Sequence, residues 1–152
     1  MRRLFVLVVF AILATICASA QTTFILVRHA EKEAAGNDPM LTKEGEARAQ
    51  ALVRMLGKQS IDAVYSTNFN RTKGTVKPLA DSKGLQVIIY EKEPDFVKLK
   101  TSGGTILICG HSNTIPQFAN KLIGKDQFQN FADNDFGNIL IIKDGSVTHL
   151  TY

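Results

Sequence analysis

The sequence FILVRH, residues 24–29, decides the fold of this chain. Its first four residues are apolar without interruption, which is typical of a central strand covered on both faces of a sheet. The basic pair Arg28-His29 follows where that strand ends. From Thr23 onward, short apolar runs alternate with longer amphipathic stretches, a pattern that indicates βαβ units. We therefore predict an α/β fold with a mostly parallel central sheet flanked by helices.

The remaining elements are expected at regular intervals along the chain. Thr42 can cap a helix that Gly57 ends, and residues 91–104 are expected to form a loop with one helical turn. The last two apolar runs flank Asp144-Gly145, a strong hairpin signal, so the sheet should end in antiparallel strands near the C-terminus. The other expected strands are residues 61–65, 85–90 and 106–109, and the other expected helices are 71–83 and 115–123.

Residues 1–20 have the layout of a secretory signal peptide, with a basic start, an apolar run and small residues at the end. We expect cleavage near Ala20, which leaves one domain over residues 21–152 and an exported protein, periplasmic or secreted. A stable membrane anchor is disfavoured, because the apolar run is shorter than the roughly 20 residues that a bilayer span needs. A lipoprotein is disfavoured because the bulky Ile16 precedes Cys17.

The composition excludes several classes of protein. Apolar residues make up 45% and charged residues 21% of the chain, as in ordinary soluble globular proteins. Removal of Arg2 and Arg3 with the signal peptide lowers the formal charge from +4 to +2, and the lysines are scattered, so no nucleic-acid partner is expected. Cys109 would then be the only cysteine, which excludes an intramolecular disulfide and favours a buried, inert thiol.

Side chains capable of chemistry follow the ends of the expected strands. Arg28 and His29 follow the first strand, His111 follows the strand at 106–109, and Arg71 lies within one turn of the end of the second strand. In an open α/β sheet, ligands bind beyond the carboxyl ends of the strands, so we expect these four side chains to face one pocket. Two arginines and two histidines together make a site for phosphate.

Four short segments carry a family resemblance. They are VRHAE at residues 27–31, LTKEG at 41–45, STNFNRTKGT at 66–75 and GHS at 110–112. In this order and on these elements, they resemble the histidine phosphatase superfamily, in its phosphoglycerate mutase-like branch. The resemblance covers nearly all of residues 23–142, and in size the chain is similar to the small phosphohistidine-phosphatase type. A phosphoglycerate mutase-like fold is implied.

The resemblance implies a phosphatase mechanism that needs no metal and no cofactor. Neutral His29 would attack phosphorus and form a phosphohistidine, which water would then hydrolyse. Arg28 and Arg71 would hold the phosphate oxygens through their planar guanidinium forks. Protonated His111 would add positive charge where the transition state is negative. The implied substrate is a phosphorylated small molecule or a phosphoprotein.

The general acid for the leaving oxygen is the least defined residue of the expected site. Related enzymes take a Glu or Asp from the loop after the third strand, and Glu91, Glu93 and Asp95 lie in that loop here. We favour Glu93, with Asp95 as the next candidate. The alternative is that all three carboxylates are solvated surface charges.

Several other interpretations compete with this one. A zinc site is disfavoured, because the neighbouring arginines would repel a cation and no third His or Cys is suitably placed. His149 lies in a hairpin strand without such neighbours and is expected to be structural or exposed. The acid-phosphatase branch is set aside, because its His-Asp pair is replaced by His111-Ser112. A noncatalytic phosphate-binding module and a phosphoglycerate mutase-like phosphotransferase stay as alternatives, although the intact His29 favours an enzyme.

Overall fold

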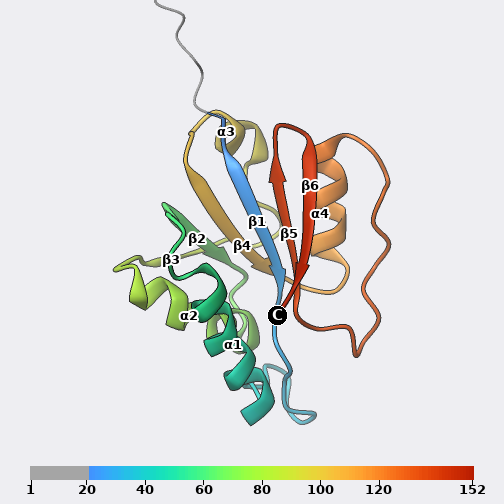
Figure 1. Ribbon diagram of the computed structural model, residues 1–152. Coiled ribbons are helices and arrows are strands. Elements are labelled where there is room, and N and C mark those ends of the chain that lie inside the picture. The colour runs from blue at the N-terminus through green and yellow to red at the C-terminus, as the bar shows by residue number, and fades with distance from the viewer. Residues whose placement is uncertain (1–20) are drawn as a thin grey trace, which may run out of the picture.

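The computed structural model describes residues 21–152, so the predicted signal peptide lies outside the described residues. A six-stranded sheet in the order β3-β2-β4-β1-β5-β6 carries helices on both faces (Figure 1). The strands are β1 (Thr23–Arg28), β2 (Ala63–Ser66), β3 (Val87–Ile89), β4 (Thr105–Gly110), β5 (Asn138–Lys143) and β6 (Ser146–Thr151). The helices are α1 (Lys43–Leu56), α2 (Asn70–Ser82), α3 (Phe96–Lys100) and α4 (Thr114–Ile123).

The pairing of the strands confirms the predicted α/β architecture. β1 through β4 form a parallel sheet, whereas β5 runs antiparallel to β1 and β6 antiparallel to β5. The β5–β6 turn contains Asp144 and Gly145 with φ values of 53° and 74°, as the tight hairpin turns with positive φ require. β1 and β4 are direct neighbours, so the residues that leave their carboxyl ends come out side by side.

Strand β1 is buried on both faces, as its continuous apolar sequence predicts. Phe24 and Leu26 belong to one apolar cluster, which α3 and α4 complete. Ile25 and Val27 belong to a second cluster, which α1 and α2 complete. Successive side chains of a strand point to opposite faces of the sheet, so the four consecutive apolar residues are divided between the two cores. Packing on both faces holds β1 in the interior of the sheet.

The start of α1 packs tightly against the segment that follows β1. The Thr42 hydroxyl accepts a hydrogen bond from the Gly45 N–H at 3.1 Å and caps the helix, as predicted. A Cβ atom on Gly45 would lie 2.1 Å from the carbonyl oxygen of Glu31, so only glycine permits this approach. The LTKEG segment thus holds α1 against the chain that carries the candidate site.

Strand β3 is shorter than the predicted 85–90. It is an edge strand that pairs only with β2, and regular pairing is limited to Val87–Ile89. Leu85 instead donates its N–H to the carbonyl of Ala80 at the end of α2. Competition from the helix end therefore delays the start of the strand.

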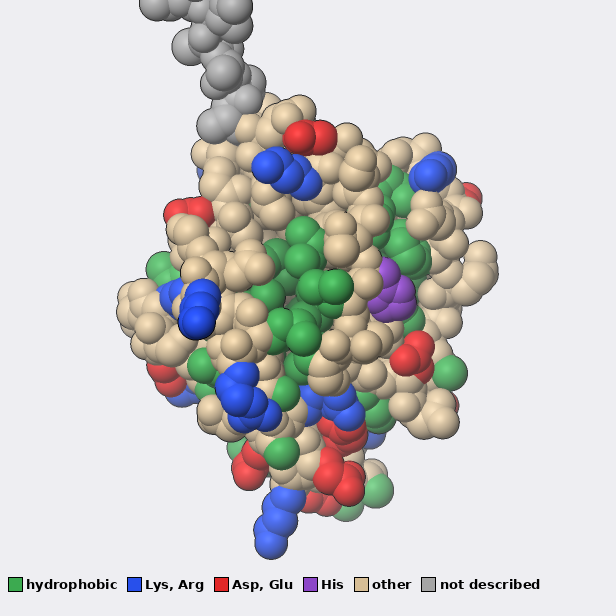
Figure 2. All heavy atoms as spheres, in the orientation of Figure 1, with side chains coloured by type: hydrophobic (Ala, Val, Ile, Leu, Met, Phe, Trp, Pro, Cys, Tyr) green, Lys and Arg blue, Asp and Glu red, His purple; other side chains and the backbone are tan. Residues whose placement is uncertain are grey.

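The face of the sheet that carries α1 and α2 is incompletely covered near β5 and β6 (Figure 1). Hydrophobic side chains gather at the centre of this face in Figure 2. Ile141 on β5 is partly buried there, and Leu150 on β6 is 37% exposed. Within residues 21–152, no helix has both the length and the apolar character needed to cross a membrane.

Candidate active site

The two histidines expected to act together do meet at the carboxyl ends of β1 and β4. The His29 N–H donates to the carbonyl of Gly110 at 2.9 Å, which continues the β1–β4 pairing by one residue. The ring centres of His29 and His111 are 5.5 Å apart, with an angle of 65° between the planes. Adjacent parallel strands thus bring together two residues that lie 82 positions apart in the chain.

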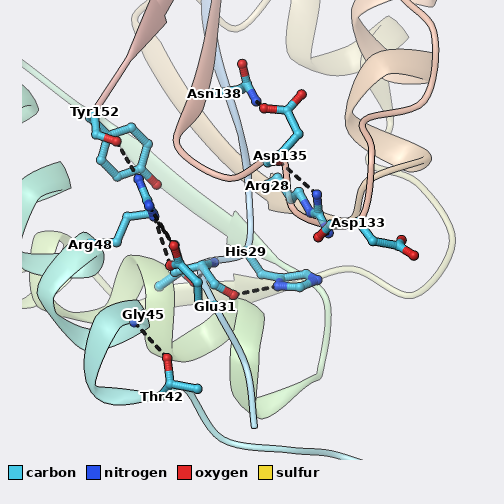
Figure 3. A network of polar contacts seen from close by, with 12 residues as sticks. Arg28, His29, Glu31, Thr42, Gly45, Arg48, Asp133, Asp135, Asn138 and Tyr152 are labelled. Carbon is cyan, nitrogen blue, oxygen red and sulfur yellow. Dashed lines mark hydrogen bonds and ion pairs between the residues drawn. The ribbon is translucent and has the colours of Figure 1, made fainter. Parts of the chain in front are cut away.

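The His29 ring is held in one tautomer. Its Nδ1 atom lies 2.8 Å from the carbonyl oxygen of Ala30, and a carbonyl only accepts, so Nδ1 carries the proton (Figure 3). Nε2 is then left with a free lone pair. Burial lowers the pKa of His29 to about 4, although the bond to Ala30 opposes this, and the nearby Arg28 lowers it further. At neutral pH His29 is therefore an uncharged imidazole with Nε2 available as a nucleophile.

The segment after His29 is fixed from two sides. The Ala30 N–H donates to the Thr75 hydroxyl at 2.8 Å, and that hydroxyl donates to the Arg71 carbonyl at 2.8 Å. Glu31 accepts hydrogen bonds from Arg48, the shortest being 2.6 Å from Nη2 to Oε1, and these bonds lower the pKa of Glu31 (Figure 3). These contacts hold the carbonyl that orients the His29 ring.

Arg28 is bound differently from the sequence-based prediction. Its Nη1 donates to the carbonyls of Ala132 and Asp135 at 2.6 and 2.8 Å, and its Nη2 donates to the carbonyl of Asp133 at 2.9 Å (Figure 3). The loop before β5 reaches Arg28 because β5 is the neighbour of β1. The guanidinium fork, expected to grip phosphate, is thus occupied by this loop. These bonds use three of the five guanidinium N–H donors, and Nε is buried without a partner.

Arg71, in the first turn of α2, is also largely buried. Its side chain is 15% exposed, and Nη1 lies 3.9 Å from Oδ1 of Asp38, a weak contact. Its Nε is buried without a partner, like that of Arg28. More than nine tenths of buried polar groups in proteins are paired, and an unpaired one costs about 1–3 kcal/mol. Two such donors beside His29 and His111 indicate a site for an anion.

The charge of His111 depends on what surrounds the ring. Burial lowers the pKa of His111 to about 4, and the positive charges of Arg71 and Arg28 lower it further. With protein groups alone around it, His111 is therefore neutral at neutral pH and not protonated. A bound phosphate dianion would raise this pKa, because an opposite charge stabilises the imidazolium. The charge of His111 thus depends on burial and neighbours that the sequence does not reveal.

Several residues of the site were missed by sequence reasoning. The Oγ1 atom of Thr67 lies 3.2 Å from Nε2 of His111 and 2.9 Å from Oγ1 of Thr72. Phe69 lies against His111, and Phe136 lies against His29. The signal available for Thr67 and Phe69 was their place in the STNFNRTKGT segment. Phe136 had no signal, because it lies in a loop more than a hundred residues after His29.

The candidate acids lie apart from this cluster. Glu93 is exposed and forms an ion pair with Lys121 on α4, with 2.5 Å between Oε1 and Nζ. Asp95 caps α3 by accepting from the Lys98 N–H at 3.1 Å. Within residues 21–152, no hydrogen bond or ion pair joins Glu91, Glu93 or Asp95 to the arginines and histidines of the site. The acid role of Glu93 stays a prediction.

That prediction can be tested with two kinds of ester. If Glu93 protonates the leaving oxygen, Glu93→Gln should slow alkyl phosphates at least about tenfold more than p-nitrophenyl phosphate, whose leaving group needs no proton. The ion pair with Lys121 is half exposed and contributes little, so it would not prevent Glu93 from moving. Steady-state rates on both substrates provide the measurement. Equal losses on the two esters would exclude the role, and a selective loss in Asp95→Asn would transfer it.

His149 and Cys109, which the sequence did not assign to the site, have other surroundings. His149 Nε2 donates a hydrogen bond to Oδ1 of Asn138 at 2.7 Å, and the His149 side chain is exposed. Cys109 is fully buried in the second apolar cluster, and burial raises the pKa of its thiol. The interpretation of Cys109 as a buried, inert thiol is confirmed.

Comparison with known proteins agrees with this geometry. The model of the histidine phosphatase superfamily, branch 1, matches residues 24–95, which include Arg28, His29 and Arg71. The match covers 72 of the 152 residues, so just under half of the chain is similar to this superfamily. It confirms the predicted resemblance over three of the four segments, whereas residues 110–112 lie outside the matched range.

One curated relative of this chain is phosphoserine phosphatase 1 from Hydrogenobacter thermophilus. The two are 38% identical over 71 residues, a match that covers 42% of this chain and 34% of the relative. The chain therefore spans about a third of the length of the curated relative it matches. Because the match covers less than half of either protein, it does not carry the relative's activity to this chain.

Solved structures share the fold of this chain across most of its length. A protein from Agrobacterium tumefaciens assigned as the phosphohistidine phosphatase SixA has a TM-score of 0.69 at 16% identity, covering 87% of this chain and 99% of its own. The protein histidine phosphatase SixA complexed with tungstate has a TM-score of 0.67 at 14% identity, covering 84% and 94%. At such identities the comparison demonstrates the fold alone.

Proposed function

We propose that this protein is a metal-independent phosphatase that hydrolyses phosphate monoesters or phosphoprotein and phosphohistidine substrates through a covalent intermediate on His29. One observation carries the proposal. A neutral histidine with a free Nε2 lies beside two buried guanidinium N–H donors, from Arg28 and Arg71, that lack protein acceptors. A nucleophile and anion-binding donors within one site are the parts that phosphoryl transfer needs.

In the first step, the Nε2 lone pair of His29 forms a bond to phosphorus and the bond from phosphorus to the leaving oxygen breaks. The leaving oxygen takes the bonding electrons and a proton, from Glu93 in our prediction or from water. The ring becomes positively charged as its nitrogen is phosphorylated. The Ala30 carbonyl, which accepts from Nδ1 at 2.8 Å, stabilises that charge without having to move.

In the second step, water attacks phosphorus and the phosphorus–nitrogen bond breaks, so that Nε2 regains its lone pair. The water proton must pass to a base or to the departing phosphate. His111 can receive it when its ring is neutral, a state that burial and the nearby arginines favour by lowering its pKa. The resulting imidazolium would then lie beside an anionic phosphate, which stabilises the charge.

The experiment that tests this function measures release of p-nitrophenol from its phosphate ester with a chelator present. We expect full activity, because the proposed chemistry uses only side chains of the protein. Loss of activity on chelation would contradict a metal-independent mechanism. Tight vanadate binding without turnover would instead support the noncatalytic module, and phosphate transfer to a second metabolite without hydrolysis would support a phosphotransferase.

We also propose that the protein is exported, on the basis of the predicted signal peptide at residues 1–20. The mature chain is then expected to begin at Gln21 outside the cytoplasm. Mass spectrometry of the periplasmic or secreted fraction identifies the N-terminus directly. Recovery of a cytosolic form that retains Met1 would contradict the proposal.

A further inference from the structure

Two phenylalanine rings flank the histidine pair. Phe69, directly before α2, lies 5.4 Å from the His111 ring, centre to centre, at 82° between planes. Phe136 lies in the loop two residues before β5, and its ring centre is 6.2 Å from that of His29, at 55° between planes. The ring contacts therefore run in the order Phe136, His29, His111, Phe69. Both phenyl rings therefore lie directly beside the histidine pair that would contact a bound phosphate.

Neither phenyl ring belongs to the apolar cores. Both are missing from the two buried clusters, against which Phe128 and Phe131 do pack. Phe69 is 39% exposed, although a phenyl ring of this size would normally be buried. Core packing thus does not account for either ring.

Each ring is held in place by an arginine of the site. The Arg71 guanidinium carbon lies 4.3 Å from the centre of the Phe69 ring, and that of Arg28 lies 4.3 Å from the centre of the Phe136 ring. Arg28 is itself bound to three carbonyls of the loop before Phe136. Both rings are therefore positioned before a substrate arrives, which reduces the entropy lost on binding.

Carboxylates accompany both arginines beside the rings. Asp38 lies 3.9 Å from Arg71, between Oδ1 and Nη1. Burial lowers the pKa of Arg28, and the charge of Asp133 opposes this shift. The positive charge beside the rings is therefore partly balanced, and the phenyl rings offer an apolar surface to an uncharged leaving group.

We propose that Phe69 and Phe136 form a recognition surface for a flat ring in the leaving group. The protein then prefers phosphates carried by an aromatic or heteroaromatic ring to phosphates carried by flexible alkyl chains. Such rings gain offset-stacked and edge-to-face contacts with phenyl rings in addition to apolar burial. This inference rests on the proposed phosphatase function and specifies the substrate class of the same site.

The test compares benzyl phosphate with cyclohexylmethyl phosphate. Both release a primary alcohol of similar acidity and size, so they differ in the flatness and π-system of the ring and not in leaving-group chemistry. We expect a higher kcat/KM for benzyl phosphate. Phe69→Leu and Phe136→Leu should each reduce that preference by roughly two- to tenfold, mainly through KM, because an aromatic pair contributes about that much.

Three controls make the result specific. Phe69→Tyr retains the ring and should retain the preference. Phe128→Leu changes a phenylalanine that packs against the core and should leave the preference unchanged. Vanadate inhibition should change less than about twofold in the leucine variants, because recognition by stacking leaves the phosphate contacts intact.

The outcomes separate this inference from the proposed function. Equal rates on the two esters, or an unchanged preference in both leucine variants, would overturn ring recognition while leaving the phosphatase function in place. A large loss of vanadate inhibition would also overturn it, since the rings would then act by supporting Arg71 and Arg28. Failure of the wild type to hydrolyse any ester, including p-nitrophenyl phosphate, would overturn the inference and the proposed function together.

Discussion

Replacement of His29 by alanine is expected to abolish turnover while the site still binds vanadate. Loss of a nucleophile should lower kcat by at least roughly four orders of magnitude, as in other enzymes with covalent intermediates. Binding should survive, because the unpaired Nε–H donors of Arg28 and Arg71 supply the anion contacts and are not removed. Steady-state kinetics and a vanadate titration of the same preparation measure the two effects separately.

The covalent intermediate itself can be trapped. Phosphorus bonded to nitrogen is labile in acid and stable in alkali, so rapid quenching of the wild type with labelled substrate should yield an adduct with this stability. The adduct should be missing from His29→Ala. If that variant retained wild-type turnover, or if the trapped adduct were stable in acid, the phosphohistidine mechanism would be withdrawn.

Arg71→Ala is expected to weaken vanadate binding about tenfold to a hundredfold and to lower kcat/KM by at least as much. A hydrogen bond to a charged group contributes about 1.5–3 kcal/mol, and the Arg71 Nε–H is buried in the site without a protein acceptor. Arg71→Lys should be intermediate, because lysine keeps the charge but not the planar donor geometry. Isothermal titration with vanadate provides the measurement.

The matched comparison is Arg28→Ala, which should lower the stability of the protein as well as its affinity for vanadate. Arg28 donates to the carbonyls of Ala132, Asp133 and Asp135, so its loss leaves these acceptors without their donor and frees the loop before β5. We expect a lower Tm for this variant in addition to weaker binding, whereas Arg71→Ala should keep a nearly normal Tm. Equal Tm losses in the two variants would show that the two arginines do not have separate roles.

Local patterns in the sequence predicted most of the elements. The cap at Thr42, the turn at Asp144-Gly145 and the short helix within residues 91–104 all depend on neighbouring residues, and the structure contains all three. The limits of β3 were predicted less well, because they depend on whether Leu85 pairs with a strand or with the end of α2. That competition is decided between segments and not within one.

The sequence by itself determined where the four candidate site residues lie relative to the strands. Arg28, His29, Arg71 and His111 follow strand ends or open a helix, and parallel strands necessarily bring their carboxyl ends to one edge of a sheet. For this reason a list of residues and an expected strand arrangement were sufficient to predict that these side chains converge.

Only the tertiary structure decided what each of these residues is free to do. The Arg28 fork is occupied by carbonyls 104 to 107 residues away, and such long-range pairing leaves no periodic signal in the chain. The neutral state of His111 results from burial and from the nearby Arg71, both of which exist only after folding. Phe136 joins His29 because β5 is the antiparallel neighbour of β1. Local sequence encodes propensities and strand ends, whereas desolvation and partner choice depend on the packing of distant segments.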